Sequence, residues 1–217
     1  MVLDAVRNVP VDKEIIIVDG CSTDGTAEIL RREIAVRDIK VIFQTARNGR
    51  GGALREGLAQ ATGEVVVFQD ADLELDPSCF PQLLQPILDG TADVVLGSRF
   101  INGKPTMTFL QHWGNVAVTW AFNLAWGTRL TDVETCYQMA KTAIVRNMRF
   151  DRTDMSFTVE LMVRLVLRRL RIVEVPVAYF PRSKSEGKKL YWTDGFVSLW
   201  VVAKYRVLSL FGSGMDV

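Results

Sequence analysis

An apolar segment that runs directly into a row of acids constrains the fold of this chain more than any other feature. The apolar run, residues 65–68, is bounded by Gly63 and Pro77, which is typical of a buried strand in a mostly parallel sheet. Asp70 and Asp72 follow it at once. Because apolar residues do not cover these acids, we expect the strand to end where the carboxylates leave the sheet.

Asp70 and Asp72 are two residues apart, and in an extended chain such residues point to the same side. Two carboxylates that face one point repel each other unless a cation lies between them. A hard divalent ion with oxygen ligands, Mg²⁺ or Mn²⁺, suits this position and usually brings substrate phosphates with it. The carboxyl ends of strands in open α/β sheets are also where ligands bind. The alternative is a solvated acidic turn that caps the next helix.

The composition is that of one globular domain. The chain has 217 residues, 48% of them hydrophobic and 24% charged, which is enough for a sizeable core. The net charge of +1 gives no field that would favour nucleic acid. The three cysteines are odd in number and lack metal-ligand spacing, so reduced thiols in a cytoplasmic setting fit best. Residues 1–10 lack a signal peptide's apolar core, and no run reaches the ~20 apolar residues of a membrane span.

Further apolar segments alternate with helical ones. We expect strands at residues 14–19, 41–43 and 93–97, and helices at residues 53–61 and 78–88. Another helix, ending near residue 37, would be capped by Ser22 or Thr23. Strands and helices that alternate with short loops predict an α/β fold with a mostly parallel, doubly wound sheet.

The second half is richer in aromatic residues. We expect helices within residues 107–126, 157–169 and 192–210, a short strand at residues 137–140, and one bent strand or two at residues 171–180. At the start, residues 1–10 resemble the end of a helix, with no strand before them. Since a βαβ unit opens with a strand, either its first ~30 residues are absent or the fold is complete in another way.

Six motifs in matching order resemble the inverting family 2 glycosyltransferases of GT-A fold, and among these the dolichyl- and polyprenyl-phosphate mannose and glucose synthases. The motifs are residues 18–26, 48–52, 70–72, 97–100, 130–137 and 186–189. The resemblance implies one GT-A domain over residues 1–217, with a Rossmann-like sheet and acceptor-side helices in its C-terminal part. The implied parts are a nucleotide-sugar half (1–103), an acceptor half (104–189) and a C-terminal amphipathic helix (190–217).

The chain departs from the family pattern in two places. The family's opening strand, whose turn touches the nucleotide, is absent from the sequence. The second acid of the family's usual Val-Asp-Asp-Gly-Ser motif is replaced by Gly20. Both departures leave the identity of the nucleotide open, and the first leaves open an inactive, N-terminally truncated chain.

The resemblance implies a donor site around the paired acids. Asp70 and Asp72 would hold Mg²⁺ or Mn²⁺ on the diphosphate of a nucleotide-sugar, with Glu74 as a further ligand or an orienting group. Asp72 would thereby be catalytic, because the metal takes up charge as the nucleoside diphosphate leaves. The residues implied to bind the nucleotide-sugar are Asp19, Arg50, Asp70, Ala71 and Asp72. The alternatives are a helix N-terminal acid for Asp19, an ordinary loop for Arg50 and a solvated acid for Glu74.

The acceptor side is implied by a polar segment and by basic residues. Asp132, or less so Glu134, would serve as a general base or organise its loop. A phosphate acceptor needs no base, since a phosphate monoester is mostly dianionic at pH 7. The residues that would bind and aim that phosphate are Arg99, Arg182, Lys184, Lys188 and Lys189. The alternatives are a surface ion pair for Arg99 and a solvated basic loop for the others.

Aromatic residues in the segments 107–126 and 192–210 suit a surface in the membrane interface, with core packing as the alternative. The sequence therefore predicts a metal-dependent transfer of mannose or glucose from GDP- or UDP-hexose to a polyprenyl or dolichyl phosphate. We expect a cytoplasmic protein, peripheral on the inner membrane face, with no nucleic-acid partner; a homo-oligomer stays open. The rival enzyme hypothesis is a saccharide hydroxyl acceptor, for which Asp132 or Glu134 would be an indispensable base.

Overall fold

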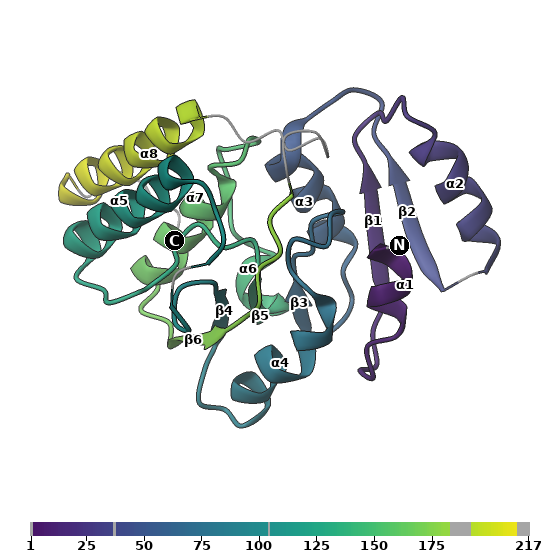
Figure 1. Ribbon diagram of the computed structural model, residues 1–217, viewed down its shortest axis with the longest axis horizontal. Coiled ribbons are helices and arrows are strands. Elements are labelled where there is room, and N and C mark those ends of the chain that lie inside the picture. The colour runs from purple at the N-terminus through teal and green to yellow at the C-terminus, as the bar shows by residue number, and fades with distance from the viewer. Residues whose placement is uncertain (1, 37, 104, 183–191, 212–217) are drawn as a thin grey trace.

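The computed structural model describes residues 2–36, 38–103, 105–182 and 192–211 (Figure 1). Strands and helices alternate along much of it, and helices cover both faces of a central sheet, so the predicted α/β class is confirmed. The sheet has two parts. A parallel pair, β1 and β2, stands apart from a four-stranded sheet (Figure 1).

The N-terminal part carries the parallel pair. Ile15 of β1 lies opposite Ile39 of β2, and the register continues to Asp19 opposite Phe43. Helix α3 packs on β1, where Gly57 lies close to Val18. The elements of this part are α1 (Val2–Arg7), β1 (Ile15–Asp19), α2 (Thr26–Glu33), η1 (Ile34–Val36), β2 (Ile39–Phe43) and α3 (Gly49–Gln60).

The four-stranded sheet has the order β3-β5-β4-β6. Its strands are β3 (Val65–Val67), β4 (Val94–Ser98), β5 (Gln138–Lys141) and β6 (Ile172–Pro176). β4 and β6 are parallel, whereas β5 is antiparallel to both of its neighbours. The strand-helix alternation did not predict this reversal, because a long helix, Phe109–Trp126, separates β4 from β5 in the chain and such a connection is typical of parallel strands. The sheet joins strands from both expected halves of the chain.

The core lies on both faces of this sheet. Side chains alternate along β4: Val94 and Leu96 face one cluster and Val95 faces the other. Helices α5, α7 and α8 cover the first face, and α4 covers the second. The remaining helices are η2 (Pro77–Cys79), α4 (Phe80–Leu88), α5 (Phe109–Trp126), α6 (Thr142–Val145), α7 (Phe157–Leu167) and α8 (Trp192–Leu210).

Within the described residues, no ladder joins β1 to β3, and no strand precedes β1. The two parts of the sheet are linked instead through Glu14. Its carboxylate accepts hydrogen bonds from the backbone N–H groups of Thr62 and Gly63, in the turn before β3. These bonds and the Lys40 ammonium lower the pKa of Glu14 to about 2, although burial opposes them.

The start of α2 differs from the sequence prediction. Its N-cap is Gly25, at φ +88°, and not Ser22 or Thr23. A turn of the chain at Cys21, which adopts φ +60°, delays the helix. The Asp24 carboxylate accepts the N–H of Thr26 at 3.2 Å, so a side chain still satisfies a donor in the first turn.

The glycine-rich turn at residues 48–52 lies against another segment of the chain. The N–H groups of Gly51 and Gly52 both donate to the Thr153 carbonyl, at 2.7 and 3.3 Å. A Cβ on Gly51 would lie 2.7 Å from the Cβ of Phe157. These glycines therefore admit a close approach of residues 152–157, and this contact lets α3 begin at Gly49 rather than near residue 53.

Helices α5 and α8 lie side by side at one end of the molecule (Figure 1) and carry all five tryptophans. Their inner residues, such as Phe122 and Tyr205, are buried. Their outer residues are apolar and exposed, including Trp113, Trp120 and Trp200. The core-packing alternative thus holds for part of this aromatic set. No helix of the described residues has the length and apolar character needed to cross a membrane.

Candidate active site

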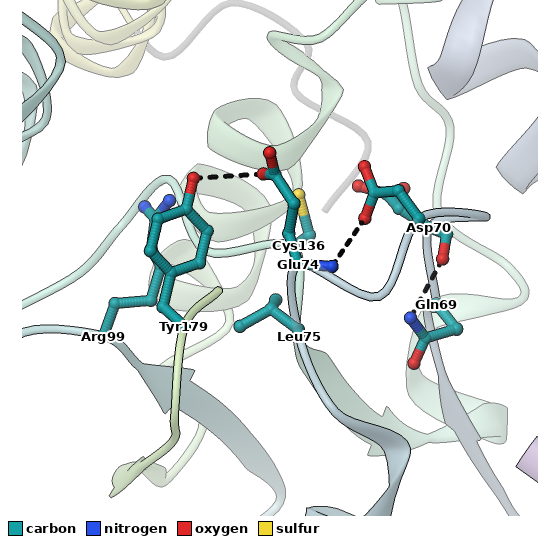
Figure 2. A pocket seen from close by; sticks show the side chains of 8 residues that line it. Gln69, Asp70, Glu74, Leu75, Arg99, Cys136 and Tyr179 are labelled. Atoms are coloured by element: carbon teal, nitrogen blue, oxygen red, sulfur yellow. Dashed lines mark hydrogen bonds between the residues drawn. The ribbon is translucent and has the colours of Figure 1, made fainter. Parts of the chain in front are cut away.

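The acids that follow β3 line one small cavity (Figure 2). Asp70, Asp72 and Glu74 line it, together with Arg99 and Tyr179 from other parts of the chain. The cavity has a volume of about 30 Å³. That is room for about two waters or one cation, since a water needs roughly 10–15 Å³ on this measure. Asp70 and Asp72 therefore line the same small cavity.

Asp70 is paired with Arg50, which projects from the first turn of α3. The Nε of Arg50 lies 2.7 Å from Oδ1 of Asp70. A second nitrogen of the same guanidinium donates to the Thr158 hydroxyl at 3.0 Å. The Arg50 side chain is therefore fixed at two points. The structure thus places one of the predicted donor-site residues directly on one of the predicted metal ligands.

Asp72 is half-buried and shares its surroundings with other acids. Burial raises the pKa of Asp72, the Asp70 carboxylate raises it further, and Arg182 opposes the shift. Its Oδ2 lies 2.5 Å from an Nη2 of Arg182, and its Oδ1 accepts the N–H of Glu74 at 3.2 Å. Because Asp70 places a second negative charge close by, a bound cation would stabilise the ionised form of Asp72.

Glu74 holds the chain segment that closes the cavity. One carboxylate oxygen accepts the Tyr179 hydroxyl at 3.0 Å (Figure 2), and the other accepts the Arg182 N–H at 2.9 Å. The Glu74 carbonyl accepts the Phe180 N–H at 2.8 Å. Of the two roles that the sequence left open for Glu74, these contacts fit the orienting one, because they tie residues 179–182 to Glu74.

Arg99 and Asp132 form a buried ion pair beside the cavity. Asp132 is fully buried, and both of its oxygens accept hydrogen bonds from the Arg99 side chain, at 2.7 and 2.8 Å. Arg99 also donates to Asn115 on α5, and its guanidinium stacks over the Tyr179 ring. A general base needs an oxygen that the acceptor can reach. This geometry favours a positioning role for Asp132.

Glu134, in the same loop as Asp132, has a raised pKa. Burial raises the pKa of Glu134 to about 7, while a hydrogen bond from Ser198 on α8 and the charge of Arg99 hold it lower. The sequence ranked Glu134 below Asp132 as a base. No sequence signal could reverse that ranking, because the burial of Glu134 comes from the packing of α8.

The donor set at the cavity fits a metal held jointly with a substrate. Within the described part of the chain, no three His, Cys, Asp or Glu side chains are grouped so as to hold a metal ion by themselves. Mg²⁺ sites commonly use only one or two carboxylates, completed by water and substrate phosphates. Asp70 and Asp72 match that smaller set. Ala71 between them is exposed, which leaves this turn open on its outer side.

Asp19 lies at the carboxyl end of β1, away from the small cavity. It is buried, and its carboxylate accepts the Ser22 N–H at 3.2 Å. Its carbonyl pairs with Gln44, which lines an open hollow of about 500 Å³ at the end of β2. Parallel strands present ligand sites at such ends. Asp19 thus lies in a different part of the molecule from Asp70 and Asp72, although all three follow or end strands at their carboxyl ends.

The sequence missed some cavity residues. Cys136, from the loop before β5, lines the cavity, and burial raises the pKa of its thiol above the usual range. Tyr179 reaches the cavity from beyond β6. No spacing in the sequence links either residue to Asp70. The predicted acceptor residues Lys184, Lys188 and Lys189 lie outside the described residues.

The fold of this chain is that of a known class of proteins. The α/β architecture matches GT-A glycosyltransferases of known structure. Glucosyl-3-phosphoglycerate synthase from Mycobacterium tuberculosis, solved with Mn²⁺, UDP-glucose and phosphoglyceric acid, matches 94% of this chain and 74% of that one, with a TM-score of 0.69 and 23% identity. At that identity the likeness concerns the fold alone.

The chain belongs to glycosyl transferase family 2, whose model matches residues 2–151. An undecaprenyl-phosphate mannosyltransferase from Micrococcus luteus is 28% identical over 87% of this chain and 80% of its own length. A dolichyl-phosphate hexose transferase from Haloferax volcanii is 31% identical over 78% of this chain and 71% of its own. A dolichol-phosphate mannosyltransferase from Pyrococcus furiosus is 37% identical, but the match spans only 25% of its length. The chain is therefore a glycosyltransferase, as the motifs predicted.

Proposed function

We propose that this glycosyltransferase moves a hexose, mannose or glucose, from a GDP- or UDP-sugar to a polyprenyl or dolichyl phosphate, with inversion at the anomeric carbon. One observation carries the proposal: Asp70, Asp72 and Arg99 line a single cavity at the end of β3, and Arg50 and Arg182 form ion pairs with the two carboxylates. These groups suit two phosphorylated ligands, one bound through a cation on the carboxylates and one through guanidinium groups.

On the donor side, Asp70 and Asp72 would hold Mg²⁺ or Mn²⁺ together with the sugar donor's diphosphate. The bound metal supplies Lewis-acid stabilisation of the departing nucleoside diphosphate. Arg50, fixed at Asp70 and Thr158, keeps the Asp70 carboxylate in place and adds positive charge beside the diphosphate. Asp19 and the hollow beside Gln44 are the proposed place for the nucleoside.

On the acceptor side, Arg99 and Arg182 would bind the phosphate. Arg99 is held rigidly by Asp132 and Asn115, so its position does not depend on the acceptor. A dianionic phosphate attacks the anomeric carbon without losing a proton, so the pathway needs no general base. The full burial of Asp132 against Arg99 supports this acceptor over a hydroxyl, because an acceptor hydroxyl could not reach that carboxylate.

A saccharide hydroxyl acceptor is the second candidate. It would require a general base, and the base works best when its pKa lies near the working pH. The pKa of about 7 at Glu134 is the observation that favours it. In that case Glu134 and not Asp132 would take the proton.

The outer faces of α5 and α8 support a peripheral position on the cytoplasmic face of a membrane. Trp120 and Trp200 are 66% and 53% exposed, and Phe109 and Phe196 are also exposed. Tryptophan is enriched at membrane–water interfaces, where its ring lies at the level of the headgroups. The relatives from Micrococcus luteus and Haloferax volcanii are named for undecaprenyl phosphate and dolichyl phosphate, which are lipid phosphates of this kind.

The test is a transfer assay with Mn²⁺, each radiolabelled nucleotide-sugar and a polyprenyl phosphate. We expect label in the lipid phase, reduced at least about 100-fold in Asp72→Asn. Asp89→Asn, an exposed acid at the end of α4, is the matched control and should keep the parent activity. Label that appears only in soluble saccharide, and is lost in Glu134→Gln, would favour the second candidate. Absence of transfer from every donor would favour the inactive chain.

A further inference from the structure

We propose that Arg182 occupies the place of the divalent cation at Asp72 in the free protein, and that binding of the cation releases Arg182 to the acceptor phosphate. This inference rests on the proposed function, because it takes Asp70 and Asp72 as the metal-binding pair. It makes acceptor binding depend on the donor side through one side chain.

Arg182 contacts Asp72 directly. The Nη2 of Arg182 lies 2.5 Å from Oδ2 of Asp72, and the other Asp72 oxygen accepts the Glu74 N–H. Both Asp72 oxygens therefore have partners within the protein. A divalent cation would bind such an oxygen at about 2.0–2.2 Å. The Arg182 guanidinium places a positive charge where the cation would bind that oxygen, and because the two charges repel, each disfavours the other.

In this position the Arg182 guanidinium leaves one hydrogen-bond donor without a partner. Its Nε is buried and has no hydrogen-bond partner among the described residues. The nearest Glu74 oxygen is 3.7 Å away, which is too far for a hydrogen bond. A buried donor without a partner is unfavourable. A phosphate could accept from Nε and an Nη together, since its oxygens match the guanidinium fork.

The Arg182 side chain can move while its backbone stays in place. Residues 179–182 are tied to Glu74 through the Tyr179 hydroxyl and the N–H groups of Phe180 and Arg182. None of these bonds involves the guanidinium. The Arg182 side chain is 36% exposed, against 14% for Arg50. Rotation about the Arg182 side-chain bonds therefore frees Asp72 without breaking the segment away.

Arg50 lacks this freedom. It also pairs with a metal-site carboxylate, but a second bond to Thr158 anchors it. We therefore assign the release to Arg182 alone. Because the two are linked, binding of the cation weakens the Arg182–Asp72 ion pair, and loss of that ion pair strengthens binding of the cation.

The test measures Mn²⁺ binding to the protein without donor or acceptor, from the electron paramagnetic resonance signal of free Mn²⁺. We expect Arg182→Gln to bind Mn²⁺ about threefold to fivefold more tightly than the parent, the range for loss of a partly exposed ion pair. Arg171→Gln removes an exposed arginine that pairs with Asp93, at a distant turn, and should leave Mn²⁺ affinity unchanged. Equal or weaker Mn²⁺ binding by Arg182→Gln overturns the inference.

A second measurement follows Arg182 directly. The rate at which p-hydroxyphenylglyoxal modifies Arg182, read by peptide mass spectrometry, should rise severalfold when Mn²⁺ is added and should already be high in Asp72→Asn. A rate that does not respond to Mn²⁺ overturns the inference even if transfer to lipid phosphate is observed. Mn²⁺ affinity unchanged in Asp72→Asn would instead overturn the metal site itself, and with it both proposals.

Discussion

Arg99 and Asp132 form a two-point ion pair in the interior, with the Nε of Arg99 2.7 Å from one Asp132 oxygen and its Nη2 2.8 Å from the other. The backbone N–H of Arg99 adds a third bond to the same carboxylate, at 3.0 Å. The pair connects the end of β4 to the polar loop before β5. It holds a guanidinium at the cavity wall in one orientation.

We predict that Asp132→Ala lowers the free energy of unfolding by about 3–5 kcal/mol, because it leaves the Arg99 charge buried without a partner. The double variant Arg99→Ala with Asp132→Ala should lose less than the sum of the two single losses. Urea denaturation of the parent, both single variants and the double variant measures this. Additive losses would show that the two side chains do not stabilise each other.

The glycine contact makes a second prediction. Gly51→Ala should lower the free energy of unfolding by about 2 kcal/mol, because the new Cβ would lie 2.7 Å from Phe157 and 2.9 Å from the Arg152 carbonyl. Gly114→Ala, on α5, is the control, since a Cβ there meets nothing within 4 Å. It should be neutral or stabilising by up to about 1 kcal/mol. Similar stabilities for the two variants would refute the close approach.

Glu134 predicts a pH dependence. Its pKa is raised from 4.5 to about 7, so between these pH values the folded state binds more protons than the unfolded state. Stability should therefore fall as pH rises through this window, by up to about 3 kcal/mol, and then level off. Glu134→Gln should remove that fall. Thermal unfolding of parent and variant at several pH values from 4.5 to 8 checks it, and parallel curves would contradict it.

The aromatic face of α5 and α8 predicts binding to lipid surfaces. Trp120→Ser with Trp200→Ser should lower co-sedimentation with anionic phospholipid vesicles severalfold, while the circular dichroism spectrum stays that of the parent. Ile29→Ser is the control, because Ile29 is also exposed, at 42%, but lies on α2. If the double variant and the control lost vesicle binding equally, the face would have no special affinity for lipid.

Much of the fold was open to prediction from the sequence because its strands are short apolar runs bounded by turn residues. The strand that ends before Asp70 and the buried strand that ends at Ser98 are both present. The start of α2 was not predictable. Its N-cap is Gly25 because the backbone turns at Cys21, and residue propensities do not indicate that turn. The antiparallel direction of β5 depends on pairing with β3 and β4, which are distant in the sequence.

The sequence by itself determined the family and the pair of acids at the end of β3, because the order of motifs and the two-residue spacing are local properties of the chain. Only the tertiary structure decided what those acids touch. Asp70 meets Arg50 from α3, and Asp72 meets Arg182 from a segment more than a hundred positions later, since its contact has a sequence separation of 110. Such pairings arise from how the sheet and helices pack, and a local pattern carries no record of them.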